Sequence, residues 1–208
     1  MKHRKWNLKN KITISLLGRS GCGKGTQAEF IMRRLGKSGY NMSMGRALRS
    51  LLRLHNPTTD QTVAILRAGK LYPSWFVQFV WLKQLIEGGH AAEHLLFDGA
   101  PRMLQEAQLL DEVIKWHGRP LPVCLYLEVS RYEATRRLRA RGRTDDTPRA
   151  IRNRMNFFDR KVMNVIRYFQ NKKRLIRING EQKPERIAVD IDRALAHRFG
   201  VLWPRAPR

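Results

Sequence analysis

The sequence predicts an α/β domain in which helices cover both faces of a five-stranded parallel sheet. Short apolar runs of strand length alternate with segments of helical periodicity, the pattern of parallel strands joined by crossover helices. Hydrophobic residues make up 42% of the 208 residues, enough for a packed core. No internal repeat or Pro- or Ser-rich linker divides the chain, so a single domain over residues 1–208 is expected.

The expected strands and helices follow from these runs. The strand-length apolar runs are 12–17, 40–44, 95–97, 123–127 and 175–178. Two segments with helical spacing contain Ala28, Ile31, Met32 and Leu35, and Val77, Val80, Leu82 and Leu85. The second follows Pro73 and Ser74, which are typical of a helix start. The tail 203–208, with two prolines, is expected to carry little order.

The chain is strongly basic. Forty-one Lys and Arg against 17 Asp and Glu give a net charge of +24, which favours polyanionic partners. The basic residues are nevertheless spread along the chain, without a single block of five or six and without an RNA-binding motif. We therefore expect nucleic-acid binding to be at most weak and non-specific.

Several other classes are disfavoured by the sequence. No apolar run approaches the roughly 18–20 residues of a membrane span, and the run 12–17 is too short for the apolar core of a signal peptide. The two cysteines, Cys22 and Cys124, show no disulfide pattern and cannot form a four-cysteine zinc site. A cytoplasmic protein without membrane attachment is expected.

The strongest local motif is the segment 18–26, Gly-Arg-Ser-Gly-Cys-Gly-Lys-Gly-Thr, between a predicted strand and a predicted helix. Its glycines let successive N–H groups face phosphate oxygens, and the following helix adds its positive N-terminal end. Lys24 can bridge the β- and γ-phosphates of a nucleotide. The motif predicts a P-loop NTPase-type fold with an ATP site at Gly18, Gly21, Cys22, Gly23, Lys24, Gly25 and Thr26.

The residue pattern of this loop is unusually specific. Gly25 follows the lysine where most P-loops place Ser or Thr, and GxxGxGKGT followed by Gln27 resembles the adenylate kinase family. Further motifs extend the resemblance, in order, over roughly residues 11–195. They are SMGRALR at 43–49, AGKL at 68–71, FDGAPR at 97–102, and GRTDD at 142–146 with Arg152 and Arg154 after it.

The resemblance implies a nucleoside monophosphate kinase of the short-lid form. An acceptor-binding insertion is expected near 43–72 and a minimal lid near 141–147, where one glycine separates Arg141 from Arg143. The implied reaction is reversible transfer of the γ-phosphoryl of ATP, with Mg²⁺, to AMP, giving two ADP. A monomer with ATP and AMP as substrates is expected.

The resemblance also assigns roles to residues. Lys24, Arg102, Arg143 and Arg154 would surround the transferred phosphoryl group, while Arg137 and Arg141, at i and i+4, would cover ATP. Asp98 would hold Mg²⁺ through water, and Asp145 and Asp146 would anchor lid arginines or contact the adenine side. The implied acceptor-site residues are Met44, Arg49, Leu71, Gly99, Arg102, Glu106, Arg143 and Arg154.

The chemistry requires such residues. Two anionic phosphate chains must lie end to end, so positive charge has to converge from several directions. Arginine supplies bidentate contacts that lysine cannot make. No strong general base is needed, because the acceptor phosphate is already anionic.

Four departures from the family pattern fall on the acceptor side: Met44, Arg46, Ala100 and Glu106. Glu106 replaces the glutamine that reads adenine; an ionised carboxylate only accepts hydrogen bonds, which suits guanine better. If the adjacent Gln105 reads adenine instead, Glu106 should point to solvent. AMP, GMP or another monophosphate therefore stay open as acceptors, and the charge supports one more alternative, a nucleic-acid-associated P-loop ATPase or assembly factor.

Overall fold

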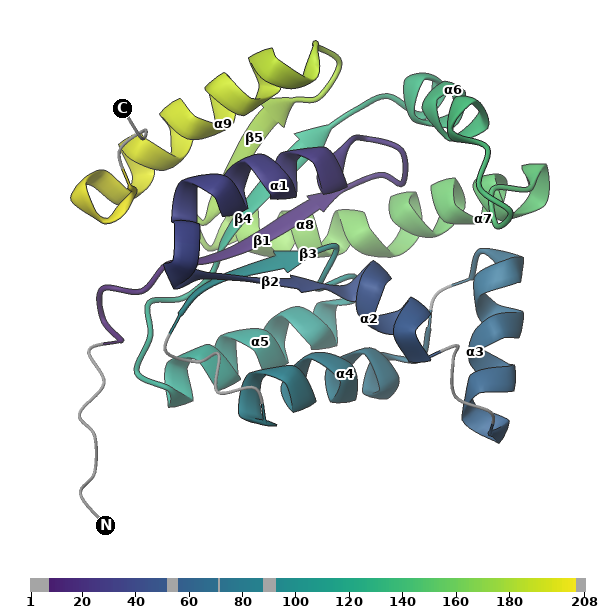
Figure 1. The fold of residues 1–208 in the computed structure, drawn as a ribbon, viewed down its shortest axis with the longest axis horizontal. Coiled ribbons are helices and arrows are strands. Elements are labelled where there is room, and N and C mark those ends of the chain that lie inside the picture. Colours follow the sequence, from purple (N-terminus) through teal and green to yellow (C-terminus); the bar gives the residue numbers. More distant parts are fainter. Residues whose placement is uncertain (1–7, 52–55, 71, 88–92, 205–208) are drawn as a thin grey trace.

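A computed structural model describes residues 8–51, 56–70, 72–87 and 93–204 (Figure 1). At its centre is a five-stranded sheet of order β2-β3-β1-β4-β5, in which every neighbouring pair is parallel. The strands are β1 (Thr13–Gly18), β2 (Gly39–Ser43), β3 (His94–Asp98), β4 (Val123–Glu128) and β5 (Leu175–Asn179). The predicted fold class and all five predicted strands are confirmed.

Helices cover both faces of this sheet (Figure 1). They are α1 (Lys24–Leu35), α2 (Met44–Leu51), α3 (Pro57–Ala68), α4 (Ser74–Glu87), α5 (Leu104–Trp116), α6 (Arg131–Arg141), α7 (Pro148–Phe157), α8 (Met163–Asn171) and α9 (Pro184–Phe199). Helices α1 and α9 pack on one face, and α4, α5 and α8 on the other. Both predicted helical patterns lie in helices, α1 and α4.

The core reflects strands that are buried on both faces. Alternate residues of β1 point to opposite sides, so Ile14 and Leu16 pack against α1 and α9 while Leu17 packs under α8. Helix α1 presents Ala28, Ile31 and Leu35 to this core, at the spacing of one helical face. The apolar runs of the sequence therefore become a sheet that is covered on both sides.

Parallel pairing brings the carboxyl ends of three neighbouring strands, β2, β3 and β1, together. Asp98, which ends β3, lies opposite Leu16 of β1 on one side and opposite Ser43 of β2 on the other. The segment 18–26 leaves β1 at this same edge and leads into α1. Open parallel sheets place ligands at this edge, so the register puts Asp98 beside the predicted phosphate loop.

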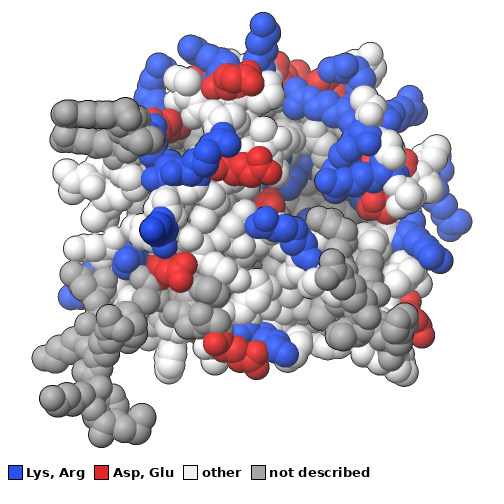
Figure 2. Space-filling view, viewed as in Figure 1, with Lys and Arg blue, Asp and Glu red and all other residues white. Residues whose placement is uncertain are grey.

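Charge is spread over the surface. Figure 2 shows Lys and Arg side chains over much of one face, more numerous in the half that holds α1, α6 and α9, with Asp and Glu among them. Among the described residues, no helix is long and apolar enough to cross a membrane.

The expectation for the tail 203–208 is wrong at its first residue. Trp203 is buried, and its Nε1 donates to Asp192 Oδ1 at 2.8 Å. The same oxygen accepts from Arg34 Nε at 2.7 Å, so Asp192 ties the middle of α9 to α1 and to the tail. Residues 205–208 lie outside the described part of the chain.

His94 generates a pH prediction. Its Nδ1 accepts the backbone N–H of Ile12 at 2.9 Å, and burial, with the charges of Lys11 and Arg119, lowers the pKa of His94 to about 4. An unfolded histidine titrates near pH 6.5, so as the pH falls the unfolded chain takes up this proton first. The free energy of unfolding should therefore decrease between about pH 6.5 and about pH 4.

His94→Asn provides the comparison for this prediction. The asparagine Oδ1 can accept the same N–H bond but does not titrate. Urea unfolding of both proteins across this range should give a flatter pH dependence for the variant. Parallel curves would show that His94 does not cause the acid loss of stability.

Candidate active site

A cleft of about 610 Å³ opens at the carboxyl edge of the sheet. The phosphate loop forms one wall, the ends of β2 and β3 form the floor, and α2, α3, α6 and α7 contribute side chains. The cleft brings together many of the residues predicted from the sequence, namely Gly21, Gly23, Lys24, Gly25, Thr26, Asp98, Gly99, Arg102, Arg137, Arg141, Arg143, Asp145 and Arg154.

The phosphate loop depends on its glycines. Gly21 has φ +87°, and a Cβ there would lie 2.5 Å from the carbonyl oxygen of Ala134 in α6, so a larger residue is excluded. Cys22 has a buried side chain in the core between the sheet and α1, and does not line the cleft. Only the backbone of Cys22 can therefore have the predicted role in ATP binding.

The side chain of Lys24, the first residue of α1, turns back onto the phosphate loop. Its Nζ donates to the carbonyl oxygens of Gly18 at 2.7 Å and Arg19 at 2.8 Å. Two neutral acceptors thus hold the ammonium group at the end of β1, close to where the loop backbone would receive phosphates.

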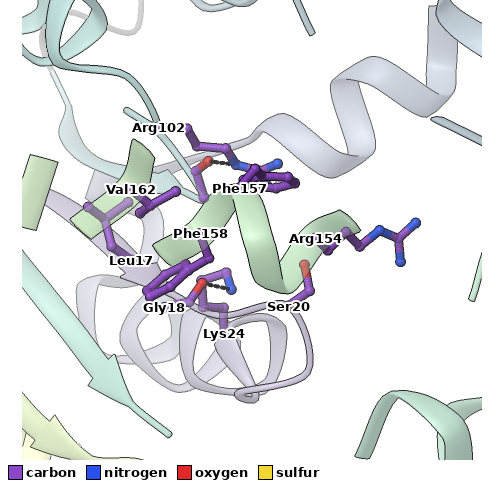
Figure 3. Close-up of a pocket in the computed structure, with 10 residues that line it drawn as sticks. Leu17, Gly18, Ser20, Lys24, Arg102, Arg154, Phe157, Phe158 and Val162 are labelled. Carbon is purple, nitrogen blue, oxygen red and sulfur yellow. Dashed lines mark hydrogen bonds between the residues drawn. The ribbon is translucent and has the colours of Figure 1, made fainter. Parts of the chain in front are cut away.

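A smaller pocket lies between the loop and α7 (Figure 3). Lys24, Arg102 and Arg154 all line it, and Phe157 and Phe158 form an apolar part of its wall. Residues with cationic side chains from three separate segments therefore line one space beside aromatic rings, with the guanidinium of Arg154 directed away from it, toward Asp145 and Asp146 (Figure 3). Such a space suits a compact anion that must be shielded from water.

The turn at Gly99, three residues before Arg102, fixes the Arg102 side chain. Its Nε donates to the Gly99 carbonyl at 2.7 Å (Figure 3), and a Cβ at Gly99, where φ is +81°, would lie 3.1 Å from Arg102 Nη2. Burial lowers the pKa of Arg102, while the carboxylates of Glu106 and Asp98 oppose that shift. Asp98 Oδ2 in turn accepts from Ser43 Oγ at 3.1 Å.

Asp146 joins two arginines from the lid region. It accepts from Arg141 at 2.9 and 2.8 Å and from Arg154 Nη1 at 2.6 Å, and its own side chain is 1% exposed. Asp145 Oδ2 accepts from Arg154 Nη2 at 2.5 Å. Asp146 thus contacts Arg141, at the start of the predicted lid, and both aspartates contact Arg154 of α7.

Arg137 and Arg143 differ in their surroundings. Arg137 Nε donates to Glu133 at 2.6 Å, and its Nη1 donates to the Gly180 carbonyl at 3.0 Å. Hydrogen bonds from Arg136 and Arg137 lower the pKa of Glu133 to about 2, so this partner is an anion at neutral pH. Arg143 is exposed on the loop between α6 and α7, at the mouth of the cleft.

The acceptor side of the cleft differs from the sequence prediction. Met44 is buried in an apolar cluster with Leu48 and Phe97, and is not among the cleft residues. The side chain of Arg49 and the whole of Leu71 lie outside the described residues. Residues that sequence reasoning did not assign line this part of the cleft, namely Asn41, Ser43, Gly45, Arg46, Leu48, Leu66 and Tyr72.

Glu106 requires a correction. Its Oε2 accepts the backbone N–H groups of Arg102 at 2.7 Å and Met103 at 3.3 Å, and its Oε1 accepts from Ser74 Oγ at 3.3 Å. The residue is 2% exposed and lines neither pocket described above, so the alternative that it points to solvent is wrong. It caps the start of α5 and holds the backbone of Arg102, whereas Gln105 is exposed.

Comparisons with known proteins agree with the motifs. A family model described as adenylate kinase matches residues 16–174. The chain is 30% identical over 185 residues to an adenylate kinase of Prochlorococcus marinus (strain MIT 9211), covering 89% of this chain and 97% of the relative. It is also 30% identical over 186 residues to an adenylate kinase of Thermus thermophilus, covering 88% of this chain and 96% of the relative.

The capping role of Glu106 can be tested by stability measurements. Glu106→Ala leaves two backbone N–H groups without their acceptor, which should lower the free energy of unfolding by about 1–3 kcal/mol. Glu106→Gln keeps an acceptor oxygen and should lower it much less. Equal losses in the two variants, measured by urea unfolding at neutral pH, would contradict the capping role.

The stability of Glu106→Gln should also differ from that of the wild type in its pH dependence. Burial raises the pKa of the Glu106 carboxyl, an effect that outweighs its hydrogen bonds from Arg102 and Met103. A raised folded-state pKa means that stability from this group is lost as the pH rises through that pKa. The stability of Glu106→Gln relative to the wild type should therefore increase with pH above the ordinary glutamate range.

Proposed function

Because the chain belongs to the adenylate kinase family, we propose that it transfers the γ-phosphoryl group of ATP to AMP, forming two ADP reversibly. Family membership makes the chain a phosphotransferase with a phosphate group as acceptor, a nucleoside monophosphate kinase that uses ATP. The observation that carries the proposal for these residues is that Lys24, Arg102 and Arg154 line the same cleft and the same smaller pocket within reach of the phosphate loop.

Catalysis in this proposal is positioning and charge stabilisation. Phosphoryl transfer leaves the protein little covalent chemistry, so the cationic groups must be in place before charge shifts between the two phosphate chains. Lys24 would exchange the carbonyls of Gly18 and Arg19 for phosphate oxygens. Arg102, held from behind by the turn at Gly99, would receive the acceptor phosphate.

The lid region would supply the remaining charge. We assign the lid to 141–147 and the acceptor-binding insertion to 43–72, which includes α2 and α3. Arg154 is already oriented by Asp145 and Asp146, whereas Arg143 is exposed and needs loop movement to reach a bound phosphate. Phe157 and Phe158 would help to keep water from the transferred group.

The residues fit a magnesium ion bound through water. Among the described residues, no group of three or more His, Cys, Asp or Glu is arranged to hold a metal directly. Mg²⁺ keeps several waters and is commonly bound by one or two carboxylates together with substrate phosphates. Asp98 lies in the cleft at the end of β3 and would hold such an ion, which neutralises phosphate charge when bound.

AMP is the acceptor that these surroundings favour. The argument for guanine depended on an ionised Glu106 facing the base, and that carboxylate is instead used by the backbone of α5. Among the described cleft residues on β2, α2 and α3, together with Tyr72, none is Asp or Glu. The acceptor wall therefore lacks a carboxylate that would reject adenine N1, and backbone groups stay available for reading the base, whereas Gln105 does not line the cleft.

A nucleic-acid-associated ATPase is the second candidate, supported by the net charge of +24. Several arginines around the cleft are paired with Asp or Glu, which reduces the charge they offer to a long polyanion. We therefore propose a monomeric cytoplasmic kinase whose nucleic-acid binding is at most weak and falls steeply with salt.

One assay separates these functions. Purified protein is incubated with MgATP and, separately, AMP, GMP, CMP or UMP, and diphosphates and free phosphate are measured with and without RNA. We expect AMP to be used best, with two ADP formed per AMP consumed and little free phosphate. Preference for GMP would reject the adenine assignment, and RNA-stimulated phosphate release without diphosphate formation would favour the ATPase.

A further inference from the structure

Arg19, the second residue of the phosphate loop, has a side chain that does not line the nucleotide cleft. Its Nε donates to the carbonyl oxygen of Val129 at 3.1 Å, and its Nη1 donates to Asp159 Oδ1 at 2.5 Å. The guanidinium carbon lies 4.5 Å from the centre of the Phe158 ring, within the range of a cation–π contact. With 15% of its side chain exposed, Arg19 is held from three directions.

The partner Asp159 belongs to a π-helical turn, Phe158–Val162, between α7 and α8. Such turns are rare and occur often at functional sites, because the extra residue per turn redirects the side chains. Here Phe158 is buried, while Asp159 lies at the surface with a 37% exposed side chain. Helix α7, which leads directly into this turn, carries Arg154 into the cleft.

The backbone of Arg19 completes the connection. Its carbonyl oxygen accepts from Lys24 Nζ at 2.8 Å in this structure, and its main chain belongs to the same loop segment, 18–26, that carries Lys24. One residue is thus linked to the cleft lysine through the loop backbone and to the α7–α8 segment through its side chain. We infer that Arg19 is a positioning residue, paired with Asp159, that sets the distance between Lys24 in the loop and Arg154 on α7. The motif GxxGxGKGT leaves this position open.

This inference rests on the proposed phosphoryl transfer, and it predicts which property changes when the Arg19–Asp159 contact is lost. A partly exposed ion pair adds little to overall stability. Displacement of a catalytic group by about 1 Å, in contrast, can cost up to about a hundredfold in rate. Loss of the Arg19–Asp159 contact should therefore lower kcat more than it changes thermal stability or the KM for MgATP.

The test is a double-mutant cycle with Arg19→Ala, Asp159→Asn and the combination. Each single change should lower kcat about tenfold with KM for MgATP changed less than about threefold, and the combination should lower kcat no further. Arg131→Ala is the matched control. Arg131 also pairs with Asp159, at 3.2 Å, but does not touch the loop, so its removal should leave kcat within about twofold.

Three results would overturn the inference. The single losses would multiply if the two residues acted separately, and kcat would stay unchanged in Asp159→Asn if the contact had no role. A variant Asp159→Asn that no longer folds would show that the contact serves the fold. A wild type that transfers no phosphoryl group at all would instead reject the proposed function, and this inference with it.

Discussion

Repulsion among like charges at the carboxyl edge of the sheet is the constraint that the neighbouring structure must satisfy. Lys24 at the end of the loop, Arg102 in the turn after β3 and Arg154 in α7 all line one small pocket. Burial lowers the pKa of Arg102, and the charge of Arg154 acts in the same direction. Each cation therefore needs a partner that holds it without filling the site.

The partners are of two kinds. Lys24 and Arg102 donate to backbone carbonyls, which are neutral acceptors and compete weakly with an incoming phosphate. Arg141 and Arg154 share Asp146, a buried carboxylate that compensates their charge and orients both. The parallel register supports this arrangement, because β1, β2 and β3 end together and bring Gly18, Ser43 and Asp98 to one edge. The fold and the charge arrangement thus depend on each other.

Much of this could be predicted from the sequence. Apolar runs predicted all five strands, and the reason is clearest for β1, β3 and β4, which are buried on both faces and almost continuously apolar. The spelling of the phosphate loop and the spacing of Arg143, Asp145 and Arg154 predicted the parts of one site, because short motifs carry their local geometry with them. Asp98 at the end of a strand was predictable for the same reason.

The rest depended on relations that a sequence does not contain. A glutamate can read a base or cap a helix, and the nearby N–H groups of Arg102 and Met103 decide that Glu106 caps α5. The sequence sign of this role was its position, three residues after Met103 at the start of the helix. Met44 begins a helix instead of ending a strand, and this shift turns its side chain into the core. Arg19 and Asp159 are 140 residues apart and meet at a π-helical turn that has no sequence signature.

The central claim is that prearranged positive charge carries the reaction, and turnover of Lys24→Ala measures it most directly. Removing one such preorganised group costs on the order of 10²–10³ in rate, so kcat should fall by that factor while the unfolding transition stays in place. Lys37→Ala is the control, since Lys37 is an exposed lysine in the turn after α1, outside the cleft. Its kcat should match the wild type. A folded Lys24→Ala protein that keeps more than about a tenth of wild-type turnover would contradict the account.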